Sequence, residues 1–144
     1  SDGASEAEVA FIRDWRARGE AAVVISYVRG EESTLRHELA HARFALDEGY
    51  RHAVLEAWAD AERTERAPGA LRKWMLSLGY HPSRHPDEFG AYLLTEPSDS
   101  FWRGRIEREQ LHALRASLAA ACEAGGACFN ASSASTQSTD SHAS

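Results

Sequence analysis

Only one stretch of this sequence, residues 21–28, has the composition of a β-strand, being rich in Val, Ile and Tyr and followed by Gly30. The other regular segments carry apolar residues three and four positions apart, which is the spacing of an amphipathic helix. These segments are residues 5–18, 33–47, 50–66, 71–78, 86–94 and 105–124. We therefore expect a predominantly α-helical protein with one small early β element, an α+β fold.

Glycine, proline and capping residues set the expected helix boundaries. Ser33 or Thr34 can cap the helix that carries Leu35 and Leu39, and Gly49 is expected to end it. Pro86 suits the first turn of a later helix, because its fixed φ is already helical and its missing N–H has no partner there.

The chain of 144 residues is long enough for one domain, which we place at residues 5–126. Residues 1–4 are expected to be flexible, and the Ser-, Ala- and Thr-rich residues 127–144 to be disordered, since they lack apolar mass. The four tryptophans are expected in the core. We expect Cys122 and Cys128 to be separate thiols, although a disulfide between them is open.

Charge and hydropathy exclude two classes of partner. The formal net charge of −6 argues against a dedicated nucleic-acid binder, because such a protein must neutralise phosphates. The longest apolar runs are too short to span a bilayer, so we expect no membrane-spanning segment. Neither observation identifies a compartment or an oligomeric state.

The strongest chemical signal is the HExxH motif formed by His37, Glu38 and His41 on an expected helix. Residues four apart lie one turn apart on the same helix face, so both imidazoles can reach one metal ion. Glu38 can then take a proton from a water at the open coordination position. Zn²⁺ is the natural metal for two histidines with a carboxylate.

A third ligand is needed, and two glutamates are candidates. Glu48 follows His41 by seven residues, at the expected end of the same helix. Glu88 opens a later helix, from which its carboxylate can be aimed at the histidine pair. The third-histidine pattern of metzincins fails, because Phe44 and Asp47 stand where glycine and histidine are required.

Residues 37–42, HELAHA, followed by residues 87–93, DEFGAYL, resemble the HExxH and (N/D)ExxA motifs of gluzincins, zinc metallopeptidases of the zincin type. The resemblance covers about residues 20–102 and is closest to the minimal members and to small eukaryotic proteins with HExxHA and NExxAYL. It implies a minimal zincin-like fold, with His37, His41 and Glu88 as zinc ligands and Glu38 as general base. The departure is Asp87, where an Asn is usual.

No motif identifies the group that would stabilise an oxyanion. Tyr92, one turn after Glu88, is the candidate that we select, and His81 and His112 are the others. We expect a zinc-dependent metallopeptidase acting on a peptide or protein, with an extended substrate adding to the edge of strand 22–28. The alternatives are a zinc-binding regulatory or interaction module without proteolytic activity, and a helical interaction domain without metal.

Overall fold

The computed structural model describes Ile25 and residues 30–125. Of these residues 77% are helical and none is in a strand. The α+β zincin-like fold that we expected is therefore wrong for this part of the chain. Residues 21–28, on which the expected strand was based, lie outside the described part except for Ile25, which has no regular structure. The described helices cover one another's apolar faces and so form a core without a sheet.

Five α-helices and two 3₁₀ helices make up the described part. They are α2 (Glu32–Leu46), α3 (Glu48–Thr64), α4 (Ala70–Ser77), η1 (Pro82–Arg84), α5 (His85–Thr95), η2 (Asp99–Trp102) and α6 (Arg108–Ala124). Each α-helix boundary lies within three residues of its expected place. The expected helix 5–18 and the terminal segments 1–4 and 127–144 lie outside the described residues.

The break between α2 and α3 falls at Asp47, and Gly49 lies in the first turn of α3. Our expectation that Gly49 ends α2 was wrong because a stronger local interaction acts two residues earlier. Asp47 is in an extended conformation, and its side chain accepts a hydrogen bond of 3.0 Å from the backbone N–H of Tyr50. Glu48 consequently belongs to α3 and not to the helix that carries the HExxH motif.

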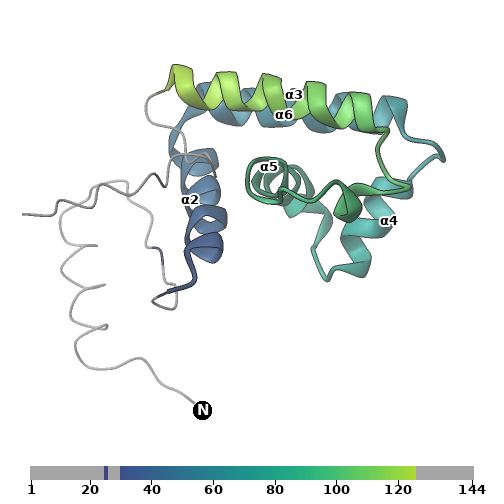
Figure 1. Cartoon of the computed structure of the whole chain (residues 1–144), viewed down its shortest axis with the longest axis horizontal. Helices are drawn as coiled ribbons and strands as arrows, with labels where there is room; N and C mark the ends of the chain where they lie inside the picture. The colour runs from purple at the N-terminus through teal and green to yellow at the C-terminus, as the bar shows by residue number, and fades with distance from the viewer. Residues whose placement is uncertain (1–24, 26–29, 126–144) are drawn as a thin grey trace, which may run out of the picture.

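Helix α5 lies at the centre of the arrangement (Figure 1) and packs against α2, α3 and α6. Helices α3 and α6 lie side by side along the top of the view, and α2 and α4 lie on either side of α5. Because α5 is surrounded in this way, most of its residues are buried. The side of α5 that faces α2 carries the site described below.

The core is rich in aromatic side chains that meet edge to face. Phe89 of α5 lies between Trp58 and Trp102, with ring centroids 5.2 and 5.6 Å away. Trp74 lies 5.4 Å from Trp102. Trp58, Trp74 and Trp102 are all buried, as expected, and Trp15 lies outside the described residues.

Arg43 links three helix ends. Its Nε donates to Asp47 at the α2–α3 break, and its Nη2 donates to the carbonyl of Cys122 in the last turn of α6, at 2.6 Å.

Cys122 itself is fully buried and disulfide-bonded, so our expectation of two separate thiols is wrong for this residue. Cys128, the chain's other cysteine, lies outside the described residues. No helix in the described part has the length and apolar character to cross a bilayer.

Gly90 allows α5 to approach α3 closely, and Gly90→Ala is expected to destabilise the protein. An added β-carbon would lie 2.8 Å from both γ-carbons of Val54, which is fully buried and stiff at χ1. Such overpacking costs about 1–3 kcal/mol, more than the gain of up to about 1 kcal/mol in helix propensity. We expect a net loss of about 1–2 kcal/mol in the free energy of unfolding, measured in urea.

The Val54→Ala background provides the control for this prediction. Removing both γ-carbons makes room for the new methyl group, so Gly90→Ala should cost less there than in the wild-type chain. An unchanged or higher unfolding midpoint for Gly90→Ala alone would contradict the prediction, since it would show that α5 can shift away from α3 without loss of stability.

Candidate metal centre

His37 and His41 lie on the face of α2 that meets α5. They are four residues apart, and their ring centroids are 4.8 Å apart in an edge-on arrangement. Both side chains are largely shielded from solvent, with 18% and 14% of their surfaces exposed. The helical repeat alone places them on one face, and the packing of α5 against α2 shields them.

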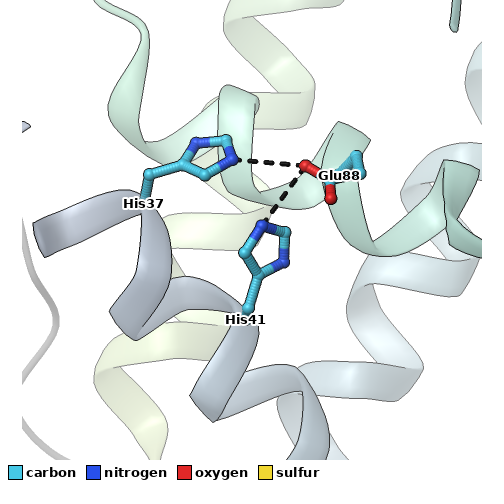
Figure 2. A group of neighbouring side chains, drawn as sticks. All are labelled: His37, His41 and Glu88. Atoms are coloured by element: carbon cyan, nitrogen blue, oxygen red, sulfur yellow. Dashed lines mark hydrogen bonds and ion pairs between the residues drawn. The ribbon is translucent and has the colours of Figure 1, made fainter. Parts of the chain in front are cut away.

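Glu88, from the first turn of α5, completes a group of three side chains (Figure 2). Its Oε2 lies 3.3 Å from Nε2 of His37 and 3.2 Å from Nε2 of His41. Its other oxygen, Oε1, accepts a weak hydrogen bond from Arg84 at 3.4 Å. Glu88 is one of two buried polar residues in the described part, with 6% of its surface exposed.

The outer nitrogen of each imidazole has its own acceptor. Nδ1 of His41 lies 2.8 Å from Oδ1 of Asp87, and Nδ1 of His37 lies 3.3 Å from the hydroxyl oxygen of Thr95. The Thr95 hydroxyl donates to the carbonyl of Ala91 at 2.7 Å, so its oxygen accepts from His37. Both rings therefore carry a proton on Nδ1 and direct Nε2 at Glu88.

The two Nε2 atoms and Oε2 of Glu88 thus converge on one point. This arrangement is unfavourable unless a proton or a cation lies between them. In the metal-free chain a proton supplies that charge. Burial disfavours charged His41, but its contacts with Asp87 and Glu88 outweigh burial and raise its pKa to about 9. Burial likewise opposes ionisation of Glu88, and the two histidines overcome it and lower the pKa of Glu88 to about 2.

A metal ion can replace that proton. One ligand atom from each of His37, His41 and Glu88 lies within 4.8 Å of the other two, so the group could hold a metal ion. Two imidazole nitrogens and a carboxylate oxygen form a donor set for a divalent transition metal. The additional acceptors Asp87 and Thr95 orient the two rings, as such partners do in metal sites.

The alternative ligand Glu48 and the oxyanion candidates His81 and His112 do not join this group. Glu48 is exposed at the start of α3, beside Arg51 and His52 on another surface. His81 is hydrogen-bonded to Ser83 just before α5, and His112, on α6, pairs with Asp99 of η2. Neither His81 nor His112 lines the pocket at the histidine pair, so the structure does not bring them to the site.

A pocket of about 420 Å³ opens over the three side chains. Its lining residues are Ser33, Thr34, His37, Glu38, His41, Tyr80, Glu88, Tyr92, Thr95 and Glu96. Glu38 and Tyr92, the two catalytic candidates from the sequence, both lie in this lining. Glu38 is half-buried and has no hydrogen-bond or ion-pair partner among the described residues, so its carboxylate is available to a ligand in the pocket.

Tyr80 is a residue of the site that the sequence analysis missed. Its hydroxyl lies 2.7 Å from the hydroxyl of Tyr92 in the pocket wall. Burial, the hydrogen bond with Tyr92 and the charge of Glu88 raise the pKa of Tyr80, which keeps its phenolic proton in place. Tyr80 lies in the loop before α5, so the helical repeat could not have related it to Tyr92 or Glu88.

Thr95 was also missed, although the sequence carried a signal for it. Glu88, Tyr92 and Thr95 are spaced by four and then three residues, which places them along one face of α5. That face lies opposite the face of α2 formed by His37 and His41. Extending the helical repeat from Glu88 would therefore have nominated Thr95 as a residue on the same face of α5, although only the packing of α5 against α2 makes it the partner of His37.

Comparisons of the chain with protein-family models, curated proteins and solved structures find no match.

Asp87→Ala is expected to weaken metal binding without abolishing it. Asp87 holds the ring of His41 through Nδ1 and is not one of the three converging ligands. Loss of such a partner typically costs about 10- to 100-fold in metal affinity. The measurement is the Zn²⁺ dissociation constant by competition with a chromogenic chelator.

Asp87→Asn is the conservative variant for this prediction, since its amide oxygen still accepts from Nδ1 of His41. Its affinity should lie between those of the wild-type and the alanine variant. Asp60→Ala is the control: Asp60 lies on α3, its half-exposed side chain pairs with Arg63, and the variant should bind Zn²⁺ as the wild type does. Equal affinity of the Asp87→Ala and wild-type proteins would contradict the role of Asp87.

Proposed function

We propose that this protein is a zinc-dependent metallopeptidase. The observation that carries the proposal is the convergence of both HExxH histidines and Glu88 at a pocket that Glu38 also lines. The motif by itself places three chemical groups on one helix. Together with the buried carboxylate from a second helix, the two histidines provide three ligands for a metal and leave its fourth coordination position for water, which hydrolysis requires.

Zinc is the metal that the ligand set fits best. Catalytic zinc sites use three protein ligands, with bonds of about 2.0–2.2 Å to nitrogen and oxygen. In a tetrahedron with such bonds, neighbouring ligand atoms lie about 3.3–3.5 Å apart. The distances of 3.2 and 3.3 Å between Glu88 Oε2 and the two Nε2 atoms are close to that spacing.

Zinc bound there would polarise a carbonyl group and lower the pKa of a coordinated water. Glu38 would accept one proton from the attacking water as the new bond between water oxygen and carbonyl carbon forms. Glu38 would then pass this proton to the amide nitrogen as the C–N bond breaks, which yields an amine and a carboxylic acid. Its lack of a partner in the described part leaves its carboxylate ready for both steps.

The paired tyrosines provide a donor for negative charge that develops on the carbonyl oxygen. When the hydroxyl of Tyr80 donates to that of Tyr92, the O–H of Tyr92 is left for a ligand. Tyr92 packs edge-on against the His37 ring, with centroids 4.7 Å apart, so its position is tied to the proposed metal. We assign Tyr92 the oxyanion-stabilising role and Tyr80 the role of positioning it.

Metal content and hydrolysis of the purified full chain test the proposal. One equivalent of zinc by elemental analysis, together with cleavage of a fluorogenic peptide library that a chelator abolishes, is the expected result. His37→Ala and His41→Ala should each lose stoichiometric zinc. Zinc retained after both substitutions would contradict the site, and no cleavage by the zinc-loaded protein would contradict the peptidase.

A non-proteolytic zinc-binding module is the second candidate function. The observation in its favour is that the described residues contain no strand to which an extended peptide could add. Under this alternative the same three residues would bind zinc and the library would remain uncleaved. The experiment above therefore separates the two functions.

A further inference from the structure

We infer that the pocket over the metal centre selects a ligand with a positively charged group, which Glu96 binds: a lysine or arginine side chain, or a free amine. This inference rests on the proposed metal site and names the class of substrate that the site would accept. It is based on the charge, hydrogen bonding and aromatic lining of the pocket, as follows.

The pocket has a strongly unbalanced charge. Its lining contains the three carboxylates of Glu38, Glu88 and Glu96 and no lysine or arginine. A divalent metal would neutralise two of the three negative charges and leave one. Because these groups line a concave surface, their field is concentrated there, and a cationic ligand is favoured over an anionic one.

Glu96 is the carboxylate best placed to bind that cation. It is partly buried and directly follows Thr95, the residue that holds His37, so it lies at the edge of the metal centre. One of its oxygens, Oε1, accepts from the backbone N–H of Ser98 at 3.0 Å, which orients the carboxylate. Its carboxylate forms no ion pair with any described residue; the guanidinium of Arg115 donates instead to the backbone carbonyl of Glu96, at 2.7 Å, and pairs with the carboxylate of Asp99.

Glu96 is the C-cap of α5, and its backbone carbonyl already accepts a hydrogen bond from Arg115, so the preference for a cation rests on the Glu96 carboxylate and not on this carbonyl. Glu88 and Glu38 have other tasks in the proposed reaction, as ligand and as base. Glu96 has no such task in the reaction; one of its oxygens holds the N–H of Ser98, and the other is left to bind a charged group.

The remaining lining is suited to a cation with an apolar stem and not to a large aliphatic side chain. No aliphatic side chain lines the pocket, whose other members are hydroxyl, imidazole and phenol groups. The two phenol rings, Tyr80 and Tyr92, lie 6.2 Å apart between centroids. Their faces can attract a cation, and their carbon atoms can cover the methylene groups of a lysine or arginine.

Three zinc-binding probes test the inference. The first is Nα-acetyl-lysine hydroxamic acid, and the second is its neutral analogue, Nα-acetyl-norleucine hydroxamic acid. The third is norleucine hydroxamic acid with a free α-amine, which separates recognition of an amine from recognition of a side chain. Dissociation constants are measured by calorimetry on the full chain loaded with one equivalent of Zn²⁺.

We expect at least one cationic probe to bind about tenfold or more tightly than the neutral probe at low salt. The advantage should shrink as sodium chloride is added, because the charges are partly exposed to solvent. Glu96→Gln should reduce the ratio between cationic and neutral probes to about one. Glu56→Gln removes an equal charge from an exposed position on α3 outside the pocket and should preserve the ratio.

The outcomes distinguish this inference from the proposed function. Equal binding of the three probes by the zinc-loaded protein, or a preference that survives Glu96→Gln, overturns the inference and leaves the metal site standing. A preference that depends on Glu96, without cleavage of any peptide, supports the inference and contradicts the peptidase. A chain that binds no zinc contradicts both.

Discussion

Glu88→Ala is expected to remove bound zinc at micromolar metal concentrations, whereas Glu48→Ala should change zinc occupancy little. Glu88 Oε2 lies within 3.3 Å of both imidazoles, and without it two neutral ligands on one helix remain. Loss of a ligand should exceed the roughly 10- to 100-fold effect of losing a supporting partner such as Asp87. The measurement is zinc content after gel filtration, with circular dichroism to verify that each variant is folded.

Glu48→Ala is a matched control, since it makes the same change at a glutamate that the sequence also nominated. Glu48 is exposed at the start of α3 and lies apart from the histidine pair. Should Glu48→Ala lose zinc while Glu88→Ala keeps it, the assignment of the third ligand to α5 would be wrong. Glu88→Gln retains the shape without the charge and should also bind zinc more weakly than the wild type.

Glu38→Gln is expected to retain one equivalent of zinc and to lose peptide hydrolysis by about 10²- to 10⁴-fold in kcat, the usual contribution of a general base. Glu38 lines the pocket but does not belong to the group of converging ligands. An amide of nearly the same shape cannot accept the proton from water. The comparison requires both zinc content and single-peptide kinetics on the same preparation.

Glu62→Gln provides the control for Glu38→Gln, because Glu62 pairs with Arg72 away from the pocket and should be dispensable for hydrolysis. Loss of zinc in Glu38→Gln would indicate that Glu38 is itself needed for metal binding. Full activity with zinc retained would instead eliminate Glu38 as the base. Either result would require a different mechanism from the one proposed.

Helix boundaries were predicted well where a local signal governed them. Pro86 lies in the first turn of α5 as expected, and α4 ends one residue before Leu78. The end of α2 near Asp47 was expected, but it was attributed to Gly49 and not to the capping carboxylate of Asp47. The fold class failed for another reason: a β-rich composition at residues 21–28 was used to infer a β element, and the described residues contain helices and loops but no strand.

The sequence by itself determined that His37 and His41 share one face of a helix, because the backbone repeat places residues four apart one turn apart. It also nominated Glu88, through a motif, with Glu48 as an alternative. Only the tertiary structure decided between them, since the packing of α5 against α2 brings Glu88 to both imidazoles and leaves Glu48 on another surface. The partners Asp87 and Thr95, the Tyr80–Tyr92 pair and the acidic lining at Glu96 likewise depend on that packing. Contacts across 46 or 58 residues follow from how two helices pack, and no local spacing rule encodes them.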